Sequence, residues 1–338
     1  MKIAFFSTHS YDIESMDAAA SREGVTPSHE LAYFTNRLSA QTAPLAAGCE
    51  GVVIFVNDTA DEETLRLLHA GGTRVLFLRC AGFDMVDLEV AKELDIPVLR
   101  VPAYSPYAVA EHAAALMMSL NRNIHRAYNR TRELNFRLAG LLGFDVHGKT
   151  VGVVGTGKIG ALFARICSGF GCTVLAYDVV QNPEALSYGA QYVTLDEIWA
   201  RSDIISLHCP LFPTTRHIIN EDSIEKMKKG ETGRSGVVII NTSRGGLIDT
   251  SALVKGLKSK KVGGVGLDVF EGEGDYFYSD HSGDLIPDDT LARLFTFSNV
   301  IITGHQAFFT KEALGNIAQT TMDNINAYVN KSEFKNRV

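Results

Sequence analysis

The sequence predicts an α/β protein built from two doubly wound parallel-sheet domains. Three observations lead to this fold class. Short apolar runs alternate with longer helix-like stretches, the alternation occurs in two separate series, and a helix-rich segment without strand-like runs lies between the series. Buried parallel strands are typically continuous apolar runs, because helices cover both faces of their sheet.

The first series lies before the helix-rich segment. Residues 61–70 and 87–94 are helix-like and lie between apolar runs, so we expect helices there. A parallel sheet needs such crossover helices, because its strands cannot be joined by tight hairpins. The apolar runs that we expect to form strands are residues 2–6, 51–56, 74–78 and 97–100.

The second series begins at residue 150 and repeats the same alternation. We expect strands at residues 150–154, 173–177, 204–207, 237–241, 265–268 and 300–303, and helices at residues 158–169, 221–228 and 250–259.

Residues 105–135 connect the two series and are rich in Ala, Leu, Met and Arg. They open with Ser105 and Pro106, a typical cap-and-proline helix start, and we expect one long helix that joins two domains. Residues 311–330 form another long helix-like stretch after the last strand, and periodicity does not determine which domain it packs on. Residues 229–236 are polar and rich in glycine, which predicts an exposed loop.

Composition excludes several classes of protein. A chain of 338 residues accommodates about two domains. The net charge of −7 and the absence of a basic block argue against a nucleic-acid partner. No apolar segment reaches the length of about 20 residues that a membrane helix needs. The five cysteines form no C-x-x-C pair, so we expect reduced thiols, no metal and a cytoplasmic protein without a membrane partner.

A G-T-G-K-I-G motif runs from Gly155 to Gly160, between an expected strand and an expected helix. Gly155 permits a tight turn, Gly157 lets backbone N–H groups approach a pyrophosphate, and Gly160 lets helix and strand pack closely. The helix N-terminus favours the phosphate charge. The next strand is followed by Asp178, an acid that binds ribose hydroxyls and repels a 2′-phosphate. We therefore expect a Rossmann domain that binds NAD in preference to NADP.

Three polar stretches follow expected strands of the second series, at the sheet edge where open α/β folds bind ligands. They are N-T-S-R-G with Arg244, D-V-F-E-G-E with Glu273, and G-H-Q-A-F with His305. Arginine binds a carboxylate in a bidentate fashion, and histidine donates a proton near neutral pH. A carboxylate beside the imidazole stabilises the imidazolium. The set fits the hydride reduction of a 2-keto acid, with His305 as the proton donor.

These motifs, together with V-P-A-Y-S-P-Y-A-V-A-E-H from Val101, resemble those of the D-isomer-specific 2-hydroxyacid dehydrogenases along essentially the whole chain. Within this family they are most similar to the fermentative D-lactate dehydrogenases. The resemblance implies reversible, NADH-dependent reduction of pyruvate to D-lactate by a homo-oligomer, a dimer or a tetramer. It also implies a Rossmann NAD domain at residues 104–303, inserted into a flavodoxin-like substrate domain made of residues 1–103 and 304–338.

The resemblance implies a catalytic role for Arg244, Glu273 and His305. We choose Glu273 over Glu271 because the acid of the family falls at the second glutamate of E-x-E. The backbone amides of Ala81 and Gly82 are implied to bind the substrate carboxylate, and Phe308 to form an apolar wall. The full set of implied substrate-binding residues is Arg79, Ala81, Gly82, Tyr104 and Phe308.

The cofactor-binding residues that the motif and the resemblance imply surround the glycine turn and three strand ends. Among them, Asp268 is expected to tune the site near the nicotinamide. They are Val109, Gly155, Thr156, Gly157, Lys158, Ile159, Gly160, Asp178, His208, Cys209, Pro210, Thr242, Ser243 and Asp268.

Two alternatives stay open. The chain could be a D-2-hydroxyacid dehydrogenase for branched, aromatic or phosphorylated substrates, although no extra basic cluster indicates a phosphate site. It could also be an NADH-sensing binding protein or corepressor with the same fold. His112, in the expected long helix, is interpreted as a packing residue or a helix-end contact. The aromatic residues 276–278 are interpreted as a loop anchor or a subunit contact.

Overall fold

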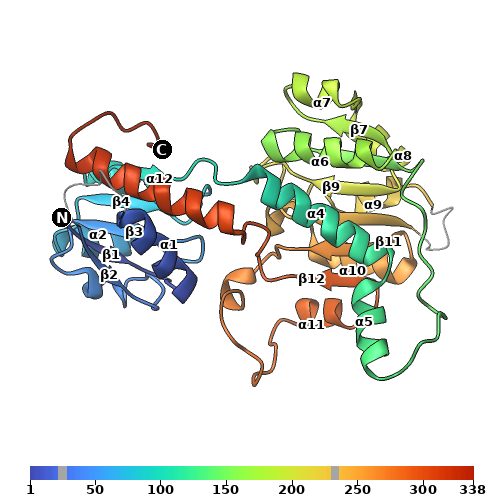
Figure 1. Ribbon diagram of the computed structural model, residues 1–338, viewed down its shortest axis with the longest axis horizontal. Helices are drawn as coiled ribbons and strands as arrows, with labels where there is room; N and C mark the ends of the chain where they lie inside the picture. The colour runs from blue at the N-terminus through green and yellow to red at the C-terminus, as the bar shows by residue number, and fades with distance from the viewer. Residues whose placement is uncertain (22–28, 230–235) are drawn as a thin grey trace. The chain divides into compact units, whose positions relative to one another are not determined.

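The computed structural model describes residues 1–21, 29–229 and 236–338, and the chain divides into two compact units (Figure 1). Unit 1 comprises Met1–Ser105 and Phe308–Val338, and unit 2 comprises Pro106–Ala307. Unit 2 is therefore inserted into unit 1 in the sequence, and the boundaries expected after residues 103 and 303 lie close to those of the units. The glycine-rich segment 230–235, expected to be an exposed loop, lies outside the described residues.

Unit 1 contains a parallel five-stranded sheet in the order β2-β1-β3-β4-β5, which is the flavodoxin-like order. The sequence did not indicate β2, an edge strand that pairs with β1. Its residues are partly exposed and do not form a continuous apolar run. The strands are β1 (Lys2–Phe5), β2 (Glu30–Tyr33), β3 (Gly51–Ile54), β4 (Val75–Leu78) and β5 (Val98–Arg100).

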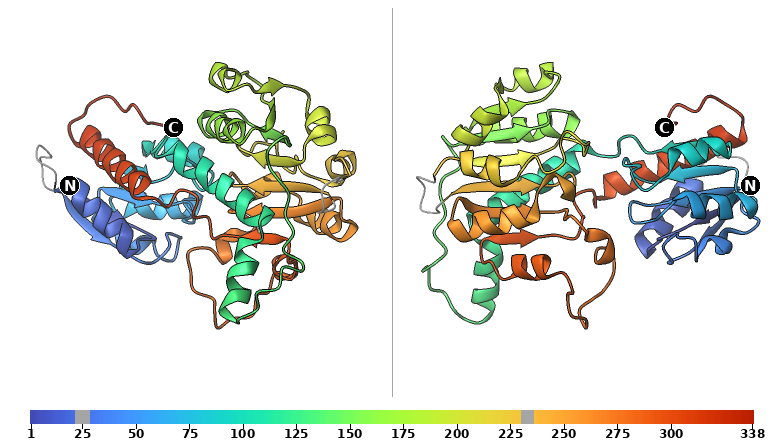
Figure 2. Two further views of the ribbon diagram at one scale, coloured as in Figure 1. Left: turned by 45° about the vertical axis from the view of Figure 1, so that its right-hand side comes forward. Right: turned by 180° about the vertical axis from the view of Figure 1, so that it is seen from behind.

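The helices of unit 1 come from both of its chain segments. The C-terminal helix α12 (Lys311–Val329) packs against α1 (Ser10–Ala20), β4 and β5, and Figure 2 shows it beside the N-terminal elements. The end of the chain therefore completes unit 1. The remaining helical elements of this unit are η1 (Ala43–Ala46), α2 (Glu62–Ala70) and α3 (Leu88–Glu93).

Unit 2 contains a parallel seven-stranded sheet in the order β12-β11-β10-β9-β6-β7-β8. This is the strand order of a Rossmann domain with one additional strand. The chain builds outward from β6 to β8 and then returns to place β9 on the other side of β6, so the switch point lies between β6 and β9. The strands are β6 (Thr150–Val154), β7 (Thr173–Tyr177), β8 (Gln191–Tyr192), β9 (Ile204–Leu207), β10 (Val237–Asn241), β11 (Val262–Leu267) and β12 (Val300–Ile302).

Helices cover both faces of this sheet (Figures 1 and 2). Helices α4 and α6 contribute to one apolar core, and α8 to α11 contribute to the other. The helical elements of unit 2 are α4 (Pro106–Asn121), α5 (Ile124–Arg132), α6 (Lys158–Gly169), α7 (Pro183–Ser187), α8 (Leu195–Arg201), α9 (Glu221–Lys226), η2 (Gly245–Leu247), α10 (Thr250–Ser259), η3 (Glu273–Asp275) and α11 (Asp289–Phe295).

The prediction of one long helix over residues 105–135 is wrong. Helix α4 ends at Asn121, and α5 begins at Ile124. Between them Asn123 has a φ of 52°, in the left-handed region that asparagine tolerates better than most residues. The Asn121 side chain donates to the Phe144 carbonyl oxygen at 2.7 Å and accepts from the Phe144 amide at 3.0 Å. This tertiary contact at the end of α4 leaves no trace in the periodicity of the sequence.

The apolar segments of the chain form the cores of these two units. In the ranges 1–21, 29–229 and 236–338, no helix combines the length and the apolar character that crossing a membrane requires.

A buried ion pair joins the carboxyl end of β4 to α1 in unit 1. Arg79 directly follows β4, and its Nη1 donates to Asp12 Oδ1 at 2.8 Å. Its Nη2 donates to the Ser7 carbonyl oxygen at 2.5 Å, and the guanidinium carbon lies 4.1 Å from the centre of the Phe55 ring. The side chains of Arg79 and Asp12 are only 2% and 5% exposed. Each charge is therefore shielded from water, and its main compensation is the charge of the other residue.

We predict that Asp12→Ala lowers the free energy of unfolding by about 3–5 kcal/mol, because it leaves the Arg79 guanidinium buried without its anion. The matched control is Glu93→Ala, which removes one of the two exposed carboxylate partners of Arg66 and should cost less than about 1 kcal/mol. Urea unfolding of both variants and the parent measures the two effects. Small and equal losses in the two variants would contradict the structural importance of the buried pair.

Candidate active site

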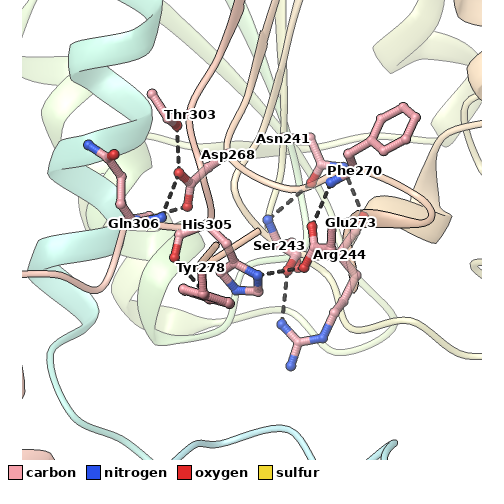
Figure 3. A network of polar contacts seen from close by, with 11 residues as sticks. Asn241, Ser243, Arg244, Asp268, Phe270, Glu273, Tyr278, Thr303, His305 and Gln306 are labelled. Carbon is pink, nitrogen blue, oxygen red and sulfur yellow. Dashed lines mark hydrogen bonds and ion pairs between the residues drawn. The ribbon is translucent and has the colours of Figure 1, made fainter. Parts of the chain in front are cut away.

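The sheet of unit 2 brings three functional loops to one edge. Strands β10, β11 and β12 are parallel neighbours, so their carboxyl ends lie at the same side of the sheet. Arg244 follows β10, Asp268 follows β11, and His305 follows β12. Figure 3 shows these residues in one polar network, together with Glu273. The sequence motifs therefore meet in space at the edge where ligands bind to this fold.

His305 and Glu273 form a close pair. Nδ1 of His305 lies 2.6 Å from Oε1 of Glu273, and Figure 3 shows the two side chains pointing toward one another. The other carboxylate oxygen of Glu273 accepts from the Phe270 amide at 2.7 Å, which fixes its orientation. Because an ionised carboxylate only accepts, Nδ1 is the donor in this contact. Nε2 is then the imidazole nitrogen left for chemistry.

The first glutamate of the same motif has a different environment. Glu271 accepts from Arg216 Nη2 at 2.5 Å and lies 3.0 Å from His217 Nε2. Its carboxylate is therefore engaged with other partners. The structure pairs Glu273, and not Glu271, with His305.

The backbone of His305 is held in a strained conformation. Its φ is 54°, in the left-handed region that is costly for residues other than glycine. The His305 amide donates to the Asp268 carbonyl oxygen at 2.8 Å, and the Tyr278 hydroxyl donates to the His305 carbonyl oxygen at 3.2 Å. The surrounding hydrogen bonds thus determine the direction of the imidazole.

Asp268 holds the turn that carries His305. Its carboxylate is fully buried and accepts from Thr303 Oγ1 at 2.5 Å, from the Gln306 amide at 2.9 Å and from the Ala307 amide at 2.8 Å. The sequence interpretation placed Asp268 among the residues that contact the cofactor. This geometry does not support a direct contact, because the carboxylate is enclosed by protein donors.

Arg244 lies in a loop whose backbone is held by side-chain hydrogen bonds. The buried Asn241 side chain accepts from the Ser243 amide at 3.0 Å and donates to the Arg244 carbonyl oxygen at 2.9 Å. The Ser243 hydroxyl donates to the Cys209 carbonyl oxygen at 2.6 Å, which connects this loop to the one that follows β9. A side chain at Gly245 would lie 2.2 Å from the backbone of Phe270, so the loop needs glycine there. Arg244 is partly buried, and its guanidinium donates to the Ser243 carbonyl oxygen at 2.9 Å.

The glycine motif forms a turn between β6 and α6. Gly155 has a φ of 92°, and a Cβ there would lie 2.4 Å from the Cys209 amide nitrogen. A Cβ on Gly160 would lie 2.0 Å from the Gly155 carbonyl oxygen. A Cβ on Gly157, in contrast, would meet no atom within 4 Å. Gly157 and Lys158 are exposed at the start of α6, where a helix N-terminus favours an anion.

Asp178 lies next to this turn. Its Oδ2 accepts from the Thr156 amide at 2.5 Å and from the Thr156 hydroxyl at 3.2 Å, and its Oδ1 accepts from the Val180 amide at 3.3 Å. The carboxylate has further acceptor capacity, so it can also accept from ribose hydroxyls. The open space at Gly157, the helix N-terminus and this acid together fit NAD.

The loop after β9 lies beside the glycine turn. Burial lowers the pKa of His208 to about 3, so its imidazole is neutral and cannot serve as the proton donor. Its Nε2 lies 2.8 Å from Ser206 Oγ, and its ring packs against Phe163. Burial raises the pKa of the Cys209 thiol to about 11, so this cysteine is not a thiolate. Pro210 is exposed beside them.

The other expected cofactor residues are distributed over the same unit. Val109 is buried in α4, Thr156 is buried below the turn, and Ile159 is partly buried in the first turn of α6. Thr242 is buried, and its Oγ1 has no hydrogen-bond partner among the described residues. The cofactor contacts of these residues stay predictions. Across the described ranges, no group of His, Cys, Asp and Glu side chains could hold a metal ion.

The expected substrate-binding residues all belong to unit 1. The rings of Tyr104 and Phe308 meet edge to face, 6.2 Å apart, and Phe55 lies 5.8 Å from Phe308. The Ala81 carbonyl oxygen accepts from Arg100 Nη1 at 2.8 Å, which holds the loop that also contains Gly82.

The expectation for Arg79 needs correction. Its guanidinium is buried and paired with Asp12 and Ser7, as described above. A direct contact of this side chain with a substrate is not supported by the geometry. Arg79 instead joins the carboxyl end of β4 to α1 and to Ser7.

Sequence reasoning missed three contacts at these places. Phe55 packs against Phe308, Tyr278 bonds to the backbone of His305, and His112 lies 3.4 Å from Asp268. The interpretation of residues 276–278 as a loop anchor does not include the contact with His305. All three contacts join distant parts of the chain. His112 ends the V-P-A-Y-S-P-Y-A-V-A-E-H motif, but the spacing of that motif does not reveal its contact with Asp268.

We predict that two glycine replacements differ in their effect on stability. Gly157→Ala should leave the melting temperature unchanged but weaken NADH binding, because the new methyl group fills the space open to the pyrophosphate. Gly160→Ala should lower the melting temperature as well, because its methyl group meets the Gly155 carbonyl oxygen. Thermal unfolding and NADH titration of both variants measure these effects. Unchanged NADH affinity in Gly157→Ala would contradict the assigned place of the pyrophosphate.

Comparisons with known proteins identify the family of this chain. Residues 114–307 match the family model described as D-isomer specific 2-hydroxyacid dehydrogenase, NAD binding domain. The chain is 50% identical over 325 residues to D-lactate dehydrogenase kk1H of Curvularia clavata, covering 96% of this chain and 91% of that protein.

Solved structures agree along the whole chain. The apo-structure of D-lactate dehydrogenase from Escherichia coli has a TM-score of 0.89 and 46% identity, with 100% of both chains covered. The pyruvate reductase of Chlamydomonas reinhardtii has a TM-score of 0.91 and 44% identity, with 99% of this chain and 98% of that chain covered. This chain therefore belongs to the D-isomer specific 2-hydroxyacid dehydrogenase family, and residues 114–307 are its NAD binding domain.

Proposed function

We propose that this protein is a D-lactate dehydrogenase that reversibly reduces pyruvate to D-lactate with NADH. The observation that carries the proposal is the 2.6 Å contact between His305 Nδ1 and Glu273 Oε1, which creates a proton donor at the ligand-binding edge of the NAD domain. The activity of the D-lactate dehydrogenases to which the chain is similar supports the choice of substrate.

The chemistry divides between three side chains. Arg244 binds the 2-keto acid through its carboxylate and polarises the keto group, since a guanidinium offers a charged pair of donors. His305, protonated and oriented by Glu273, donates the proton on Nε2 to the keto oxygen. Glu273 stabilises the imidazolium through its negative charge. In the reverse direction His305 accepts the proton from the hydroxyl group of D-lactate.

NAD is held by the residues around the glycine turn. Gly157 and the first turn of α6 bind the pyrophosphate, and Asp178 binds the adenosine ribose. When bound, NADH supplies the hydride that reduces the keto carbon. Neutral His208 and the uncharged thiol of Cys209 line the adjacent loop without taking part in proton transfer.

Unit 1 supplies the remaining substrate-binding residues. We propose that the backbone amides of Ala81 and Gly82 bind the substrate carboxylate. Tyr104 and Phe308, with Phe55 behind Phe308, form an apolar wall that suits a short side chain such as the methyl group of pyruvate.

We also propose that the protein is a cytoplasmic homo-oligomer, a dimer or a tetramer, with a fermentative role. The segment from α5 onward exposes the large apolar side chains of Tyr128, Leu134, Phe136 and Leu138. Exposed apolar groups of this kind favour association between subunits. The five cysteines are free thiols, as is typical of a reducing compartment.

The proposal predicts that the purified protein oxidises NADH with pyruvate and releases D-lactate. A panel of 2-keto acids with straight, branched, aromatic and phosphorylated side chains, followed by chiral analysis of each product, tests this. Pyruvate should give the highest kcat/KM, because the apolar wall limits the side chain.

The other outcomes identify the alternatives. A strong preference for a larger 2-keto acid would assign the chain to another D-2-hydroxyacid dehydrogenase. Tight NADH binding without turnover of any member of the panel would indicate an NADH-sensing protein, and L-lactate as the product would contradict the proposal.

A further inference from the structure

His112 lies in α4 and contacts the group that organises the His305 turn. Its Nε2 is 3.1 Å from Thr303 Oγ1 and 3.4 Å from Asp268 Oδ1. The His112 side chain is 19% exposed, whereas the Asp268 carboxylate is fully buried. The helix is therefore connected to the ends of β11 and β12 through one imidazole.

The protons of this cluster can be assigned by counting donors and acceptors. Thr303 has one hydroxyl proton, and its oxygen lies 2.5 Å from Asp268 Oδ1 but 3.4 Å from the Leu267 carbonyl oxygen. The proton therefore goes to the carboxylate, the closer and charged acceptor. The oxygen of Thr303 can then only accept from His112, so Nε2 of His112 carries a proton and donates it.

This donor supports the orientation of His305 in two steps. The Asp268 carboxylate binds the amides of Gln306 and Ala307, the two residues that follow His305. The Asp268 backbone also accepts from the His305 amide and thereby stabilises its left-handed conformation. If Asp268 rotates, the turn loses these bonds, and the imidazole no longer has a fixed distance to Glu273.

We propose that His112 is a positioning residue for His305, acting as the hydrogen-bond donor that fixes Thr303 and Asp268. The inference rests on the proposed function, since it assigns His305 the proton transfer. His112 itself does not touch the substrate or the cofactor in this role. It contributes a hydrogen bond from Nε2 to the Thr303 hydroxyl oxygen.

Three replacements at this position separate donation from packing. Glutamine can place an N–H donor near the position of Nε2, glutamate has the same shape but only accepts and adds a negative charge beside Asp268, and methionine fills the volume without a donor. We expect His112→Met and His112→Glu to lower kcat by about tenfold, less than the ~10²-fold that a 1 Å misplacement of a reacting group costs. His112→Gln should retain most of the parent kcat, and the affinity for NADH should be unchanged in all three.

A second readout does not depend on turnover. In protein labelled with ¹⁵N-histidine, the Nδ1 proton of His305 should give the resonance of a strong hydrogen bond in the parent and in His112→Gln. It should shift or broaden in His112→Met. His147→Met, which removes an exposed histidine bonded to the Phe170 carbonyl oxygen, is the matched control and should behave as the parent.

The outcomes distinguish this inference from the proposed function. Equal kcat values in the parent and in folded His112→Met would overturn the inference. A loss in His112→Gln as large as that in His112→Met would also overturn it, because donation would then be irrelevant. A parent that reduces no 2-keto acid would refute the proposed function instead, whereas the NMR comparison would still test the positioning of His305.

Discussion

The active site depends on one buried carboxylate. Asp268 is enclosed by protein, and its oxygens bind a threonine hydroxyl and two consecutive backbone amides. A buried charge is stable only when donors surround it, so this carboxylate forces the chain after β12 into a single turn. That turn carries His305 in a left-handed conformation, which an unsupported histidine would leave. The direction of the imidazole, and hence its pairing with Glu273, therefore follows from the hydrogen bonds that the protein donates to the Asp268 carboxylate.

The fold places these groups by topology. Parallel neighbours in the order β12-β11-β10 deliver His305, Asp268 and Arg244 to one edge, and the switch point beside β6 delivers the glycine turn to the same edge. The chemistry and the cofactor site therefore share one sheet. Unit 1 has a sheet of the same kind, stabilised at its carboxyl edge by the buried pair of Arg79 and Asp12.

The predictable part of the fold consists of strands buried on both faces. β6, β7, β9 and β10 have the bounds expected from the sequence, because their residues are continuous apolar runs. The edge strands β2 and β8 were not expected, since their residues include exposed polar side chains and form no continuous apolar run. The edge strands β5 and β12 were expected, because apolar runs mark them. The break between α4 and α5 was missed because a tertiary contact at Asn121 determines it.

Motifs could reveal the residues of the site but not their burial. Arg244, Glu273 and His305 were found because their motifs follow strands in a fixed order. Arg79 and Asp268 belong to such motifs too, yet both side chains are enclosed, which only packing decides.

The central claim is that Glu273 stabilises the imidazolium of His305 during reduction. The most direct measurement is the pH dependence of pyruvate reduction in Glu273→Gln. Reduction needs protonated His305, and a neutral amide stabilises that charge less. The rate should therefore decline at a lower pH than in the parent. Glu271→Gln, which alters the neighbouring acid paired with Arg216, should keep the parent profile. An unchanged profile in Glu273→Gln would contradict the account.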